Sequence, residues 1–266
     1  MLSNLHTHTL FCDGKSSAEE VVLSAIKKGF SSIGFSGHGY TNFDLTYCMK
    51  DMDGYIKEIL RLKEKYKKDI QIYLGIEEDA FSPVDRTPFD YILGSSHYLN
   101  IGSNYYPVDS GYEGLKKCID MFDGDIIKLA DSYYSNFCEY IKNHKPDIIG
   151  HFDLITKFDE LDESLFFAND EYNKLAEKYI AIAAQSGCMF EVNTGAISRG
   201  VRTTPYPKDN LLHILKKQGA KIVLNSDSHH ADTLDFAFDE AKLLLKDIGF
   251  EYTYILYNNE FKKDLL

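Results

Sequence analysis

Short apolar runs alternate along the chain with longer segments in which apolar residues recur every three or four positions. Most of the short runs are continuously apolar and end in polar residues. This pattern is typical of strands that are buried on both faces, as in a parallel sheet covered by helices. The expected strands span residues 2–8, 31–38, 70–79, 91–99, 147–153, 189–195 and 221–229.

The longer segments predict amphipathic helices. In the first, residues 16–30, Ser16 and Glu19 have the spacing of a capping box, and the apolar residues that follow keep a period of 3.6. Gly187 and Gly219 follow two later segments, in the position where a glycine commonly ends a helix. The other expected helices span about 55–66, 126–141, 171–185, 211–217 and 234–245.

Seven alternations of strand and helix predict an α/β fold with a closed or nearly closed barrel, and an open doubly wound sheet is the alternative. No linker, low-complexity tract or short repeat interrupts the pattern, so residues 1–266 are expected to form a single domain. Residues 39–53 and 100–114 are too long for plain connections and are expected to be irregular. Such loops at one end of the strands usually shape a pocket.

The net charge of −12 and the absence of a Lys/Arg cluster disfavour a protein that grips long nucleic acid or an anionic membrane. Five scattered cysteines without a CxxC pair indicate a reducing compartment. No run of about 18 apolar residues occurs, and the first residues lack the pattern of a signal peptide. The chain is therefore expected to be soluble and cytoplasmic.

Six of the nine histidines fall at the carboxyl ends of the expected strands, where α/β barrels and sheets form their active sites. Two carboxylates share this location. His6 and His8 are two residues apart, so they project from the same side of a strand, and Asp227 and His229 do likewise. The complete set is His6, His8, His38, His97, His151, His229, Glu77 and Asp227.

Imidazole and carboxylate groups are ligands of zinc, iron and manganese. A mononuclear catalytic zinc needs about three protein ligands, whereas eight candidates converge here, or nine with Asp13. The surplus predicts two or three divalent ions, with a carboxylate such as Glu77 bridging a pair. For a single histidine the alternative is a hydrogen-bonded core residue, and for Asp13 an ordinary Asp-Gly turn. Without metal, however, the whole set would be a core of unpaired polar groups, which is costly.

The sequence resembles the PHP (polymerase and histidinol phosphatase) family over nearly its whole length. The resemblance depends on seven motifs in order. They are HTHTLFCDG (6–14), SGHG (36–39), GIEED (75–79), SSHY (95–98), GHFD (150–153), EVNTG (191–195) and SDSH (226–229). The resemblance implies a distorted (β/α)7 TIM-like barrel with a trinuclear metal centre.

The resemblance also implies which residues hold each ion. The ligands of the first metal match His6, His8, Glu77 and Asp227. The second metal would share Glu77 and add His97 and His151. The third would take Asp13, His38 and His229. The chain departs from the family at Gly37, where many relatives carry an acidic residue, and at Asp13, where some relatives carry histidine.

The chain length and the lack of a polymerase region resemble stand-alone histidinol phosphatases. This implies hydrolysis of a small phosphorylated substrate, L-histidinol phosphate, to L-histidinol and phosphate in histidine biosynthesis. The stretch NTGAISRG (193–200) departs from the usual run of these enzymes, but Arg199 is expected to bind the phosphate, with help from Arg202. A surface salt bridge is the alternative for Arg199, and an exposed loop position for Arg202. Asp153 and His230 are the candidates for protonating the leaving group.

The sequence is also compatible with two other functions. One is a PHP phosphoesterase that acts on nucleotides or nucleic-acid ends, although the acidic surface disfavours long polymers. The other is a non-catalytic metal-binding module, which the intact ligand set disfavours.

Overall fold

The computed structural model describes residues 1–161 and 165–266. Seven parallel strands form one sheet, and each expected strand is confirmed, most of them shorter than the apolar pattern suggests. In spatial order the strands are β1 (Ser3–Asn4), β2 (Ser32–Phe35), β3 (Gln71–Asp79), β4 (Tyr91–Ser95), β7 (Ile148–Ile149), β8 (Met189–Asn193) and β9 (Ile222–Asn225).

The sheet curls until its first and last strands meet just beyond β1 and β9. Thr7 and Ser228 form a parallel bridge there. Next to this bridge, a side chain takes the place of a backbone acceptor between the two strands: Asn225 Oδ1 accepts a hydrogen bond from the backbone N–H of Leu5 at 2.8 Å. The result is a nearly closed, distorted seven-stranded barrel, so the expected barrel is confirmed and the open doubly wound sheet is wrong.

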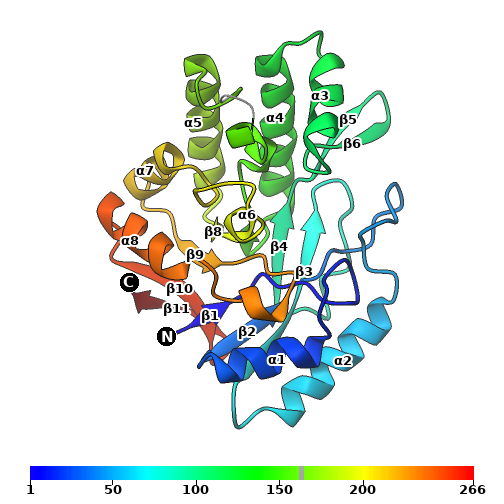
Figure 1. The fold of residues 1–266 in the computed structure, drawn as a ribbon, viewed down its shortest axis with the longest axis vertical. Coiled ribbons are helices and arrows are strands. Elements are labelled where there is room, and N and C mark those ends of the chain that lie inside the picture. The colour runs from blue at the N-terminus through cyan, green and yellow to red at the C-terminus, as the bar shows by residue number, and fades with distance from the viewer. Residues whose placement is uncertain (162–164) are drawn as a thin grey trace.

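Helices cover the outside of the barrel (Figure 1). The pair α1 (Ala18–Lys27) and α2 (Met52–Lys65) lies on the opposite side of the barrel from α4 (Ile126–His144) and α5 (Asp170–Ala184). The pair α7 (Asp209–Lys217) and α8 (Phe238–Ile248) flanks β9. All six expected helices are present with shifted ends, and none of the described helices is both long and apolar enough to cross a membrane.

Helix α1 begins one residue later than its capping pattern predicts. Ser17, not Ser16, is the N-cap, and its side chain and that of Glu20 form the reciprocal capping box. Ser16 instead accepts a hydrogen bond from the N–H of Ala231 at 3.1 Å. The capping chemistry is as expected, but the tertiary contact of Ser16 shifts its register by one.

Residues 100–114 are not irregular, contrary to expectation. They contain most of an antiparallel hairpin, β5 (Tyr98–Ile101) and β6 (Asn104–Pro107), and the start of α3 (Tyr112–Asp120). The other long stretch has no helix or strand before α2, but it is pinned to the hairpin because Phe43 stacks on Tyr105 with ring centroids 4.0 Å apart.

Several further elements carry no clear periodic signal in the sequence. A second hairpin, β10 (Tyr252–Tyr257) and β11 (Glu260–Leu265), packs against β9 and β1. Helix α6 (Gly195–Ser198) follows β8, and single 3₁₀ turns span Leu154–Thr156, Asp159–Leu161 and Ala231–Thr233.

The amino-terminal half of the barrel interior is an apolar plug. Its members come from six barrel strands or their ends and from β10, and they are Leu5, Tyr73, Tyr91, Leu93, Ile148, Met189, Val223 and Leu256. The Tyr91 ring lies against two glycines: a Cβ atom would fall 2.4 Å from its Oη at Gly34 and 2.3 Å from its Cζ at Gly75. The plug leaves only the carboxyl end of the barrel for polar side chains.

Candidate metal centre

The nine candidate ligands gather at this carboxyl end. They form overlapping groups whose ligand atoms lie within 4.8 Å of one another. The groups are His6 with His8 and Asp227, His6 with Glu77 and His151, His38 with Glu77 and His97, and His8 with Asp13, His38 and His229. Seven of the nine residues are buried, Asp13 and His229 being the more accessible pair. These clusters are consistent with a multinuclear metal site.

The two histidines after β1 project to the same side, as their spacing predicts. The Nε2 atoms of His6 and His8 lie 3.5 and 3.2 Å from Asp227 Oδ1. They lie 3.4 and 3.6 Å from Glu77 Oε2. Two imidazoles and two carboxylates therefore surround one point at the end of the barrel.

Glu77 lies at the middle of the site, and its two oxygens face different histidines. Oε2 faces His38 Nδ1 at 2.8 Å and also the His6/His8 pair. Oε1 faces His97 Nε2 at 3.4 Å and His151 Nε2 at 3.1 Å. A carboxylate in this orientation has the geometry of a bridge between two ions.

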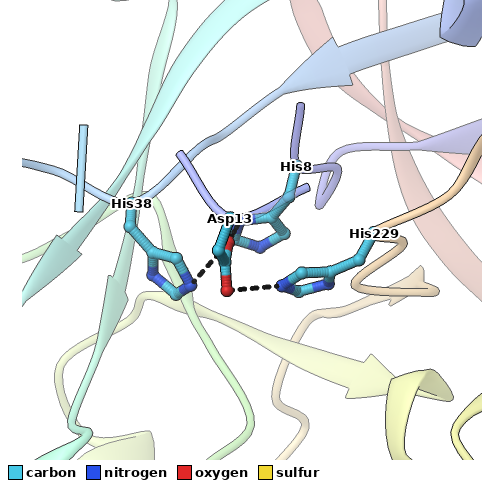
Figure 2. A group of neighbouring side chains, drawn as sticks. All are labelled: His8, Asp13, His38 and His229. Carbon is cyan, nitrogen blue, oxygen red and sulfur yellow. Dashed lines mark ion pairs between the residues drawn. The ribbon is translucent and has the colours of Figure 1, made fainter. Parts of the chain in front are cut away.

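The outer group surrounds Asp13, as Figure 2 shows. Asp13 Oδ1 lies 3.7 Å from His38 Nε2, and Oδ2 lies 3.3 Å from His229 Nε2. The ring of His229 stacks on that of His8 with centroids 4.1 Å apart. The Asp13 side chain is 34% exposed, so this group faces solvent while the others lie below it.

Two further carboxylates orient the histidines from behind. Glu191 Oε1 lies 2.6 Å from His6 Nδ1, and Asp79 Oδ2 lies 3.2 Å from His97 Nδ1. Both contacts leave Nε2 of the histidine directed at the centre, as is usual for histidines that bind metals. Neither carboxylate is assigned a role from the sequence. The available signal for Glu191 was a carboxylate in the middle of an otherwise apolar strand.

The electrostatics favour the metal-binding form at two of the candidate ligands, His8 and Glu77. Burial, and after it the neighbouring His229 and His38, lower the pKa of His8 to about 3. Burial acts to raise the pKa of Glu77, but the surrounding histidines, His38 and His6 first, hold it well below its usual range. A neutral imidazole and an ionised carboxylate are the forms that coordinate cations.

Unpaired atoms test whether the residues fit a metal. Among the described residues, His6 Nε2, His8 Nε2 and Glu77 Oε2 are buried and have no hydrogen-bond partner. Buried polar atoms are rarely left unpaired, because desolvation is costly. Since these three atoms face a common point, the donor set fits divalent cations bound by imidazole and carboxylate.

A cavity of about 410 Å³ opens above the ligands. Besides ligand side chains, its wall carries both cations and an acid. The other lining residues are Lys15, Asp109, Leu154, Lys157, Ser198, Arg199, His230 and Thr233. Asp109 is the one lining residue that comes from the two long stretches expected to shape a pocket. The volume and charge suit a small polar molecule.

Arg199 lines this cavity from the end of α6. Its guanidinium donates to Asp227 twice, from Nη2 to Oδ2 at 2.9 Å and from Nη1 to the backbone oxygen at 3.1 Å. The ion pair is with a candidate ligand, not with a surface acid. Arg199 is therefore fixed beside the centre.

Arg202 and Asp153 do not line the cavity, so the expected contacts with phosphate and leaving group do not fit their positions. Arg202 is 3% exposed, and its Nη1 donates to Thr156 at 3.1 Å. Asp153 is fully buried and accepts from the N–H of Lys208 at 3.0 Å. The loop that follows α6 turns Arg202 inward, and sequence spacing carries no information on that turn.

Two neighbours of the candidate ligands lie on different sides of the sheet. His230 does line the cavity, where its Nδ1 accepts from the N–H of Asp232 at 3.2 Å, and its role in proton donation stays a prediction. Glu78 points away from Glu77 and binds Arg86 and Tyr140 on the outer side of the sheet.

Comparison with known proteins relates this chain to a protein family. Residues 4–195 match the family model described as PHP domain. A protein of Schizosaccharomyces pombe named "Probable histidinol-phosphatase" is 28% identical, covering 92% of this chain and 86% of the relative. The histidinol-phosphatase of Bacillus subtilis is 26% identical, covering 88% and 96%.

A solved structure has the same fold. It is that of histidinol phosphate phosphatase from Lactococcus lactis complexed with zinc, L-histidinol and phosphate. The TM-score is 0.75 at 22% identity, with 98% of this chain and 99% of the other covered. The nearly closed barrel is therefore shared with that protein.

Proposed function

Because the chain belongs to the PHP domain family, we propose that it is a metal-dependent phosphatase of small phosphomonoesters, with L-histidinol phosphate as its substrate. The observation that carries the proposal is the convergence of nine imidazole and carboxylate side chains, six of which line a cavity of about 410 Å³. Such a set fits more than one divalent ion, which is the arrangement used for in-line displacement at phosphorus.

The proposed ligands divide as the distances suggest. The set for one ion is His6, His8, Asp227 and Glu77, and Glu77 extends its second oxygen to the pair His97 and His151. Asp13, His38 and His229 would hold a third ion nearer to solvent. Zinc, iron and manganese all accept these donors. Bound ions would supply Lewis-acid stabilisation and activation of water for attack on phosphorus.

The protein's own cations would orient the phosphoryl group. Each terminal nitrogen of Arg199 donates one hydrogen to Asp227, and its second hydrogen is the proposed donor to a phosphoryl oxygen in the cavity. Lys15 adds positive charge to the same wall, whereas Lys157 forms an ion pair with Asp109 at 3.1 Å. His230 is the proposed proton donor to the leaving alkoxide, because it lines the cavity and Asp153 does not.

Three observations support histidinol phosphate as the substrate. Relatives named histidinol-phosphatase align over most of this chain and over most of their own length. The Lactococcus lactis protein of the same fold holds L-histidinol and phosphate. The cavity wall also carries the carboxylate of Asp109, the acid of an ion pair with Lys157, as a polar partner for a substrate amine.

The decisive experiment is steady-state phosphate release from L-histidinol phosphate beside a panel of phosphomonoesters and nucleotides. The protein is purified without chelator, its metal content is counted, and a His8→Ala variant serves as the metal-site control. We expect the highest kcat/KM for histidinol phosphate and its loss in the variant.

Other results would separate the alternatives. Turnover of other panel members only would keep the phosphatase and overturn the substrate. Bound metal without turnover of any phosphoester would overturn the enzyme proposal and leave a metal-binding module.

A further inference from the structure

A second group of polar side chains lies behind the cavity wall, and the proposed reaction uses none of them. Asp153, Arg202 and Tyr206 are each at most 3% exposed. Each keeps one buried atom without a hydrogen-bond partner in the described part of the chain: Asp153 Oδ1, Arg202 Nε and Tyr206 Oη. Buried polar atoms are normally paired with protein or with ordered water, so these three atoms need an explanation.

The three side chains lie next to one another. The guanidinium carbon of Arg202 lies 4.1 Å from the centroid of the Tyr206 ring, and its Nη1 lies 4.0 Å from Asp153 Oδ2. The backbone of Tyr206 pairs with Asn193 at the end of β8. Asp153 accepts from the N–H of Lys208, two residues after Tyr206. The group is therefore held in place by backbone contacts on both sides.

The group also borders one of the proposed ligands. The Tyr206 ring meets the ring of His151 nearly edge to face, with centroids 6.2 Å apart. His151 directs Nε2 at Glu77, while its Nδ1 is buried and without a partner among the described residues. His6 and His97 differ, because each has a carboxylate at Nδ1. Metal-binding histidines almost always donate this second ring N–H to a carboxylate, a carbonyl or a water.

We propose that Asp153, Arg202 and Tyr206 form a positioning cluster that orients His151 through one or two ordered waters. The donors and acceptors match: the N–H groups of His151 and Arg202 donate to water, while Asp153 Oδ1 and the tyrosine oxygen accept from it. A buried water needs two to four such partners. The bridge holds the proton of His151 on Nδ1 and directs the lone pair of Nε2 at the metal. The proposal rests on the proposed function only in requiring the metal centre.

This role also explains why the cluster is charged but closed to substrate. Arg202 and Asp153 are buried behind the wall, and neither lines the cavity. They act on the reaction only through His151 and are positioning residues, not catalytic ones. The hydroxyl of Tyr206 is the atom that can be removed with least change of shape.

The test measures zinc affinity in the absence of substrate. Tyr206→Phe removes one oxygen, and Asp153→Asn removes a charge at nearly constant volume. Tyr134→Phe is the matched control, because Tyr134 is fully buried and packs on Phe152 beside the cluster, but its hydroxyl bonds to Tyr172 at 2.7 Å. Zinc is titrated against a chromophoric chelator, and folding is checked by thermal denaturation.

We expect one zinc ion to bind about tenfold more weakly in Tyr206→Phe and in Asp153→Asn, the scale known for partners of metal-binding histidines. Affinity in Tyr134→Phe should match the wild type. The double variant should lose about tenfold and not about a hundredfold, because a shared bridge is lost only once.

Three results would overturn the proposal: unchanged zinc affinity in Tyr206→Phe, an equal loss in Tyr134→Phe, or losses that multiply in the double variant. Zinc binding without turnover of any phosphomonoester would overturn the proposed function but leave the affinity comparison decisive for this cluster. A wild type that binds no zinc would overturn both.

Discussion

At the scale of single residues, the site depends on which atom of each side chain points at its centre. His6 could present either ring nitrogen, but Glu191 occupies Nδ1 at 2.6 Å and leaves Nε2 for the centre. Glu191 is itself held in place, because its Oε2 also accepts from the backbone N–H of His151 at 2.9 Å and from Asn193 Nδ2 at 2.8 Å. Glu191, which is not a proposed ligand, therefore fixes the orientation of His6, which is one.

Replacing this carboxylate should weaken metal binding without unfolding the protein. We expect Glu191→Gln to lower the affinity for one ion about 10- to 100-fold, because the amide no longer supports the His6 N–H with a full charge. Metal content after dialysis and chelator competition would measure it. The matched control is Glu78→Gln, the buried neighbour of Glu77 on the outer side of the sheet. It should cost about 1–3 kcal/mol of stability and leave metal affinity unchanged; equal metal affinity in the two variants would contradict the assignment.

Arg199 should matter for turnover more than for metal content. We expect Arg199→Ala to lower kcat/KM for the phosphomonoester about 100-fold, the usual scale for removing one donor to developing charge. The kcat/KM of Arg199→Lys should fall between those of the wild type and Arg199→Ala, because lysine keeps the charge but not the planar fork. Steady-state kinetics with metal analysis would measure both effects.

The control for Arg199 is Arg61→Ala, which removes an exposed arginine of α2 that pairs with Glu58. Its kinetics should match those of the wild type. Wild-type kcat/KM in Arg199→Ala would remove this residue from the proposed phosphate site.

At the scale of elements, β2, β3 and β4 fit together around one aromatic ring. Tyr91 begins β4 and crosses the barrel interior to donate its hydroxyl to the backbone oxygen of Leu5 at 2.5 Å. Gly34 in β2 and Gly75 in β3 leave the space that the ring occupies. The apolar plug fills the barrel interior below the strand ends that carry the candidate ligands, and it therefore supports their positions.

This packing predicts a selective rescue. Gly34→Ala and Gly75→Ala should each destabilise the protein by about 1–3 kcal/mol or more through overpacking. Tyr91→Phe should relieve much of the cost at Gly34, where the added methyl group meets the hydroxyl oxygen at 2.4 Å. It should not relieve Gly75→Ala, where the clash is with ring carbon at 2.3 Å. Chemical denaturation of the single and double variants would check this, and equal rescue at both positions would refute the placement of the ring.

At the scale of the whole molecule, the candidate centre joins elements that are far apart in sequence. Its ligands come from β3 and from the ends of β1, β2, β4, β7 and β9. His8 and His229 lie on either side of the seam where the first and last strands meet through the bridge of Thr7 and Ser228. Ions held there would add links across the weakest part of the barrel.

Removing metal should therefore lower thermal stability. An ion that binds only the folded state and is present at about 1,000 times its Kd adds about 4 kcal/mol, which corresponds to about 10 °C in Tm for a chain of this size. Scanning calorimetry with and without chelator would measure the difference. In His8→Ala the difference should shrink, and an identical Tm with and without chelator in the wild type would contradict the metal centre.

The sequence by itself predicted the seven barrel strands, most helices and the candidate ligand set. Continuous apolar runs mark strands buried on both faces, and polar residues at their ends mark the carboxyl edge of the barrel. The spacing of His6 and His8 is enough to place both side chains on one face. These features are local, since each depends on the period of one element or on where it stops.

The tertiary structure decided what local pattern does not contain. Ser17 caps α1 because Ser16 is taken by Ala231, 215 residues away. Arg202 is buried behind His151 because the loop after α6 folds back onto β8, and Lys208 of that loop donates to Asp153. Arg199 instead reaches Asp227, which follows the neighbouring strand β9. Glu191 gains its role only when β8 lies beside β7 and near β1. The chemistry of each residue could be predicted from the element that carries it. Its partners could not, because they lie on strands that are distant in sequence and that only the closed barrel brings together.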